Sequence, residues 1–95
     1  MYIQITKAPV KRGTKRDVLE NIWRDLMPDF RSSAGFHVLY PLTDDNVLVA
    51  GAISLWDRKD DADAAEPLFR RAIDAFSDFY ESEPSVEGYQ ASILT

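Results

Sequence analysis

The chain contains no cysteine and only one histidine, His37, among its 95 residues. The absence of thiols excludes disulfides, thiol nucleophiles and thiolate metal sites. With a single imidazole, and with the carboxylates gathered in an acidic run that lacks ligand spacing, we expect no metal centre. Nucleophile-elbow, phosphate-loop and dinucleotide-binding motifs are also missing, so we predict no bound cofactor.

Long hydrophobic runs and an excess of positive charge are missing too. No apolar run approaches the roughly 18 residues that a membrane span needs. Met1 begins a strand-like pattern without the basic and apolar segments of a signal peptide, so we expect a cytoplasmic protein. The net charge of −5 disfavours nucleic acid as a partner. The basic cluster between Lys7 and Arg16 is interpreted as a solvated loop, with a small-anion site as the alternative.

The length and composition suit one small globular domain covering residues 1–95. A chain of this size buries only about 60 to 70% of the surface that its unfolded form exposes. The content of 45% hydrophobic and 28% charged residues is ordinary for a soluble globular protein.

Two helices are predicted from residues that recur at helical spacing. The first covers residues 14–27, with Thr14 as its N-cap and Pro28 ending or kinking it. The second follows the acidic run after Trp56 and continues to Tyr80. Because a proline inside a helix costs about 3 kcal/mol, we expect Pro67 at the first position of a second helical segment, after a bend.

Alternating apolar residues predict strands at 2–7, 36–40, 46–56 and 86–94. Pro41 and the polar segment after it are expected to form a hairpin turn. The order strand, helix, strand, strand, helix, strand predicts a ferredoxin-like α+β fold, with a four-stranded antiparallel sheet and two helices on one face.

The strand 46–56 is apolar on both faces. Strands of this kind are normally covered on both sides, and two helices can cover only one face of the sheet. We therefore expect a homodimer that forms through the second sheet face.

Two segments resemble the dimeric α+β barrels, and among them the antibiotic-biosynthesis monooxygenase-like domains. They are LMPDFRSSAGF, which links a first helix to a glycine-aromatic strand start, and SLWDRKDDADAA, a third strand that ends in tryptophan before an acidic helix start. The resemblance implies a dimeric barrel with a small-molecule cavity between each sheet and its helices. It also implies cofactor-independent oxidation of aromatic polyketides, or haem cleavage in a sister group.

In that family a tryptophan at the end of the third strand works with an asparagine on a strand and with a tyrosine or histidine on the second helix. Trp56 matches the tryptophan. Ala52 stands where the asparagine is expected, and no histidine, asparagine or tyrosine lies between Asp57 and Phe79. Haem cleavage needs an axial ligand from that helix, so haem is the lowest-ranked ligand.

Two residues are candidates for catalysis. Trp56 is either a buried anchor or a cavity wall that stacks on a planar substrate. His37 is either a polar residue on a partly exposed strand or a base with a pKa near neutral pH. The predicted substrate pocket combines small and aromatic side chains with polar ones that share a sheet face: Gln4, Ala52, Ser54, Phe69, Phe76 and Tyr89.

The leading hypothesis is therefore a homodimer that binds a small, flat, aromatic or quinone-like molecule and oxidises it with molecular oxygen. The alternative is a non-catalytic binding or dimerisation module.

Overall fold

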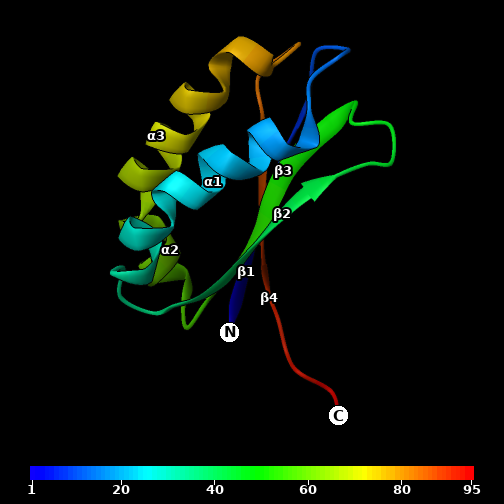
Figure 1. Cartoon of the computed structure of the whole chain (residues 1–95). Coiled ribbons are helices and arrows are strands. Elements are labelled where there is room, and N and C mark those ends of the chain that lie inside the picture. The colour runs from blue at the N-terminus through cyan, green and yellow to red at the C-terminus, as the bar shows by residue number, and fades with distance from the viewer.

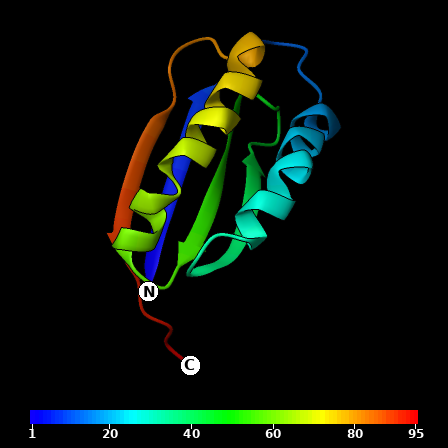
Figure 2. The same cartoon turned by 90° about the vertical axis from the view of Figure 1, so that its left-hand side faces the viewer.

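The computed structural model describes residues 1–95 as a four-stranded sheet with helices on one face (Figure 1). The sheet is antiparallel in the order β2-β3-β1-β4, which confirms the predicted ferredoxin-like arrangement. Figure 2 shows the helices lying in front of the sheet, with the C-terminal residues running away from it. The elements are β1 (Tyr2–Pro9), α1 (Arg16–Arg31), β2 (Phe36–Thr43), β3 (Val49–Trp56), α2 (Lys59–Ala64), α3 (Glu66–Phe76), the short 3₁₀ helix η1 (Ser77–Phe79) and β4 (Ser85–Gln90).

The register of the central strands decides which residues face the helices. Paired residues in an antiparallel sheet point to the same side, and successive residues alternate. Tyr2 pairs with Trp56, and Thr6 pairs with Ala52, on the face that the helices cover. The other side of the sheet, called the open face below, is apolar and uncovered in the single chain. It carries Ile3, Ile5, Val38, Tyr40, Val49, Ile53 and Leu55.

An aromatic cluster between the helices and the sheet forms most of the core. Phe30 of α1 and Trp56 of β3 are both fully buried. Phe69 of α3 lies between them, with its ring centroid 5.2 Å from that of Phe30 and 6.0 Å from that of Trp56. These contacts tie both helices to the end of β3.

The first helix differs from the prediction at both ends. It begins at Arg16, and Thr14 does not cap it, because its hydroxyl donates instead to the carbonyl of Lys11 at 2.6 Å. The helix does not end at Pro28, as one of the two predicted outcomes had it, since it continues to Arg31. A proline in the last turn removes a single backbone bond, and continuing the helix buries Phe30 completely.

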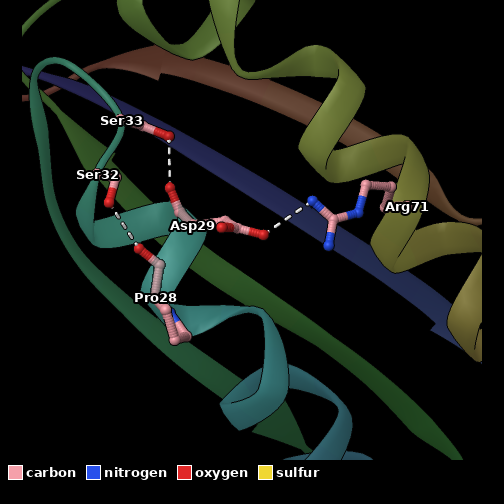
Figure 3. A network of polar contacts seen from close by, with 5 residues as sticks. All are labelled: Pro28, Asp29, Ser32, Ser33 and Arg71. Atoms are coloured by element: carbon pink, nitrogen blue, oxygen red, sulfur yellow. Dashed lines mark hydrogen bonds and ion pairs between the residues drawn. The ribbon is translucent and has the colours of Figure 1, made fainter.

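Side chains then close this helix end, as Figure 3 shows. The hydroxyl of Ser32 donates to the carbonyl of Pro28, and that of Ser33 donates to the carbonyl of Asp29, each at 3.0 Å. The carboxylate of Asp29 also accepts a hydrogen bond from Arg71 of α3 at 2.9 Å. The Ser33 hydroxyl thus satisfies the carbonyl of Asp29, and the Ser32 hydroxyl adds a second hydrogen bond to the carbonyl of Pro28, which also accepts from the backbone N–H of Ser32. The Asp29–Arg71 pair links α1 to α3.

The hairpin between β2 and β3 lies later than predicted. Pro41 is inside β2, which continues to Thr43. A proline is tolerated there because β2 is an edge strand and one side of its backbone needs no partner. The turn is held by Asp44, whose carboxylate accepts from the backbone N–H groups of Leu48 and Val49. These two hydrogen bonds hold the pKa of Asp44 below its ordinary value.

The second helical region agrees with the prediction at Pro67, because α2 ends before this residue and α3 has it in the first turn. It ends earlier than predicted, since α3 stops at Phe76 and η1 at Phe79, and the backbone of Tyr80 is already extended. The last strand is shorter than predicted and ends at Gln90. It pairs with β1, which begins at Tyr2, so the chain beyond Ala91 has no strand left to pair with. The final ladder bond runs from the N–H of Ala91 to the carbonyl of Met1.

Candidate functional site

An apolar cavity lies between α3 and the sheet, at the end away from Trp56. Its upper wall is aromatic, formed by Trp23, Phe69 and Phe76, and its floor includes Ala8 and Ala50. The enclosed volume is about 20 Å³, roughly the room for one water molecule. A larger ligand must therefore push the walls apart.

Small residues explain why the cavity lies at this end of the sheet. Ala50 and Ala8 face the helices, and Ala72 of α3 faces the sheet with 1% of its surface exposed. A Cβ atom at Gly51 would lie 1.7 Å from the carbonyl oxygen of Thr6, so no larger residue fits there without a backbone shift. At the other end the buried ring of Trp56 fills the same layer.

Tyr80 and Pro84 also line the cavity, and because both are only partly buried they lie on its solvent side, called the mouth below. The backbone of Tyr80 pairs with Val10, and its ring stacks on that of Phe76 with 6.3 Å between centroids. Burial, with a smaller effect of the Asp74 carboxylate, raises the pKa of Tyr80 to about 12. The phenol therefore stays protonated at neutral pH and can donate a hydrogen bond at the entrance. Thr6 provides a second hydroxyl group on the sheet side.

Trp56 is part of the packed core and lines none of the hollows in the protein. Its indole N–H donates to the hydroxyl of Ser54 at 2.9 Å, and both side chains are buried. The rings of Phe36 and Phe69 lie 5.3 Å and 6.0 Å away. This environment matches the anchor interpretation of Trp56, and a bound substrate could not reach the ring unless the core opened.

His37 lies on the edge strand β2, outside the cavity. Its Nε2 atom is 2.5 Å from Oδ1 of Asp57, and 46% and 61% of the two side chains are exposed. The pair is not among the side chains that surround the cavity.

The predicted pocket residues separate into four groups, of which the last is Tyr89. Phe69 and Phe76 line the cavity, and Ala52 and Ser54 are buried in the sheet beside it. Gln4 faces the helices but lines a different cleft, of about 270 Å³, between α2 and β4.

Tyr89 lies on the opposite side of the sheet from Gln4. It pairs with Ile3 on the open face, and 51% of its surface is exposed. Its hydroxyl donates to the carboxylate of Glu87, and this hydrogen bond raises the pKa of Tyr89. The polar patch that would join Gln4 and Tyr89 is therefore not formed.

Of the cavity residues, only Phe69 and Phe76 were predicted from the sequence, and the missed ones include Trp23, Ala72 and Tyr80. Trp23 and Ala72 belong to the apolar stripes of their helices, and such stripes do not distinguish a cavity wall from a filled core. Tyr80 follows the last helical turn, where spacing carries no information about side-chain direction.

Comparisons with known proteins match this geometry at the level of the fold. No protein-family model and no curated protein matches the sequence. Among solved structures, a putative antibiotic biosynthesis monooxygenase from Nitrosomonas europaea superposes with a TM-score of 0.77 at 17% identity, covering 95% of this chain and 88% of that one. A monooxygenase of Streptomyces coelicolor, in complex with the ligand nanaomycin D, gives 0.77 at 15% identity, with 99% and 91% covered.

A variant of SnoaB, a cofactor-independent oxygenase from Streptomyces nogalater, gives a TM-score of 0.76 at 17% identity, with 98% and 94% of the two chains covered. The chain thus has the α+β fold of the antibiotic biosynthesis monooxygenase-like proteins. This finding confirms the fold that the sequence resemblance implied. Neither of its longer helices is apolar enough to cross a membrane.

Proposed function

We propose that this chain binds a small, flat, mostly apolar molecule beneath its helices and oxidises it with molecular oxygen. The substrate class is aromatic or quinone-like, and the protein's own residues supply no redox group. The observation that carries this proposal is the apolar cavity between the aromatic rings of the helices and the alanine floor of the sheet. Its support is the shared fold with monooxygenases, one of them solved with nanaomycin D.

The chemistry that such a cavity favours is orientation and exclusion of water. Oxidation of a CH₂ group between two aromatic rings, as in anthrone, to a carbonyl consumes one O₂ and releases one H₂O, so the substrate itself provides all the electrons. The protonated phenol of Tyr80 would donate a hydrogen bond to a substrate oxygen at the mouth. Trp23, Phe69 and Phe76 would hold the ring system by stacking.

A non-catalytic binding or dimerisation module is the second candidate. The observation in its favour is that Trp56, the tryptophan at the family's functional position, is completely buried in the core. Under this proposal the cavity would bind a ligand without turnover, or the chain would serve only to form a dimer and the cavity would have no ligand. Haem binding remains the third candidate.

We also propose that the working protein is a cytoplasmic homodimer joined through the open face. That face presents aliphatic side chains of three strands to solvent, with Ile53 and Leu55 of β3 near its centre. Covering it with a second copy would bury apolar surface at about 25 cal/mol per Å².

Filling the cavity tests the proposal. Ala72 lines it, whereas Ala75, on the same helix, is exposed. We expect Ala72→Leu to abolish the rise in melting temperature that a bound ligand causes, and Ala75→Leu to keep it. The ligand panel would hold anthrone, anthraquinone and haem, with circular dichroism to verify that each variant is folded.

Oxygen consumption separates the candidates. Uptake of O₂ in the presence of anthrone, lost in Ala72→Leu, supports the oxygenase. A melting shift with the same ligands but without uptake supports the binding module, and a shift with haem alone supports the third candidate. A shift that survives Ala72→Leu, or none with any ligand, refutes the cavity as the site.

A further inference from the structure

Three hollows in the protein share one wall, the indole of Trp23. The first is the cavity beneath α3, and the second, also of about 20 Å³, lies between the start of α1 and the end of β2. The third is a groove of about 350 Å³ between α1 and β2. Adjacent hollows share further walls as well: Ala50 and Gly51 border the first two, and Glu20 and Pro41 border the last two. The three therefore form a row beneath the helices.

Trp23 is the side chain that separates the members of this row. It extends from α1 towards α3, with its ring centroid 5.0 Å from that of Phe76 and 6.2 Å from that of Phe30. Only 5% of its surface is exposed. A change of its rotamer, or its replacement by a smaller side chain, would connect the cavity beneath α3 with the groove.

The groove differs from the cavity in its charge. Its floor is apolar, formed by Trp23, Met27 and Leu39, but Arg24 and Arg31 line it as well. Arg31 takes part in no ion pair, and Arg24 donates only to the side-chain oxygen of Asn21, at 3.1 Å. The one acidic residue in the lining is Glu20. Two guanidinium groups above an apolar floor suit a carboxylate on an apolar body.

We infer that the cavity and the groove are two halves of one site for an elongated aromatic carboxylic acid, with Trp23 as the residue that sets how far the ligand reaches. The inference rests on the proposed function, since the ring system would occupy the cavity beneath α3. The carboxylate would lie in the groove against Arg24 and Arg31. At about 350 Å³ the groove is large enough for part of such a ligand, because small-molecule pockets commonly span roughly 300 to 1,000 Å³.

The test uses matched pairs of ligands that differ only in charge. Anthraquinone-2-carboxylate and its neutral amide have the same ring system. We expect Arg24→Gln with Arg31→Gln to weaken binding of the carboxylate by about tenfold or more, as the loss of charge-assisted hydrogen bonds predicts. Binding of the amide should stay unchanged. Arg12→Gln, an exposed arginine outside the groove, is the control for net charge.

Two more variants test the role of the groove and of Trp23. Glu20→Gln removes the groove's only acid and should strengthen binding of the carboxylate. Trp23→Leu should improve the affinity for a four-ring aromatic carboxylate relative to that for a two-ring one. Trp23→Phe should have the same effect more weakly, and it replaces the leucine variant in the test if that variant fails to fold. Isothermal titration calorimetry measures each constant.

The outcomes separate the two proposals. One outcome refutes the extended site and leaves the proposed function intact. In that outcome the amide binds the wild-type protein, Ala72→Leu abolishes this binding, and the arginine variants change the affinities for carboxylate and amide by the same factor. An unchanged ratio of four-ring to two-ring binding in both Trp23 variants also refutes the extended site. If neither ligand binds the wild-type protein, the extended site is refuted, and the melting shifts with anthrone and anthraquinone decide the proposed function separately.

Discussion

The hydrogen bond between Trp56 and Ser54 offers a sharp test of the idea that Trp56 anchors the core. The two side chains are 0% and 1% exposed, so neither polar atom has water as an alternative partner. Ser54→Ala leaves the indole N–H buried and unpaired, which costs about 1 to 3 kcal/mol. For a domain of this size that corresponds to a fall in melting temperature of roughly 4 to 8 °C per kcal/mol.

The complementary variant, Trp56→Phe, keeps an aromatic ring against Phe36 and Phe69 but leaves the hydroxyl of Ser54 unpaired. Replacing both partners removes both unpaired groups. The double variant should therefore be more stable than the sum of the single losses predicts, by about 1 kcal/mol. Urea unfolding at one fixed protein concentration gives the four free energies, because the stability of a dimer depends on concentration.

Additive losses, with a coupling energy below about 0.3 kcal/mol, would refute this reasoning, since sites without contact add within that error. If Ser54→Ala lowers the free energy of unfolding by less than about 0.5 kcal/mol, the reasoning is refuted too, because a change of that size is typical of substitutions at the surface. Either result would mean that Trp56 is less enclosed in solution. The interpretation of Trp56 as a wall of the ligand site would then be favoured over that of a core anchor.

Three further predictions follow from other parts of the structure. If the proposed dimer forms through the open face, Ile53→Asp should convert it to a monomer in light scattering, whereas Val18→Asp on α1 should not. An intact dimer in Ile53→Asp would contradict the proposed interface. Because the pKa of Tyr80 in the folded protein, about 12, lies above the ordinary value of 10.0, its contribution to the stability is present below pH 10 and is lost as the pH rises towards 12. Tyr80→Phe should therefore lose less stability over that interval, and equal losses by urea unfolding would show that Tyr80 is not buried. Gly35→Ala should destabilise the protein by about 1 to 3 kcal/mol, since Gly35 has a φ of 74° and a Cβ there would lie 2.0 Å from Oδ2 of Asp61. A change in the free energy of unfolding below about 0.5 kcal/mol, the cost of an ordinary surface substitution, would contradict this prediction.

Local pattern was sufficient for the order and type of the elements. The alternation in residues 46–56 identified a strand with two apolar faces, and the structure leaves one of those faces uncovered. Pro67 was correctly placed at a helix start, because its missing N–H and fixed φ act within a single turn. Such effects depend on neighbours in sequence, so the sequence alone contains them.

Features that depend on partners far apart in sequence were decided only by the tertiary structure. The continuation of α1 past Pro28 reflects the burial of Phe30 against Phe69, which outweighs one missing backbone bond. The register between β1 and β4 places Tyr89 opposite Ile3, and a shift of one residue would have put it on the other face. The cavity exists because Ala50 and Ala72, distant in the chain, meet where neither fills the space. Packing of this kind is a property of pairs of elements, and no single segment of the sequence specifies it.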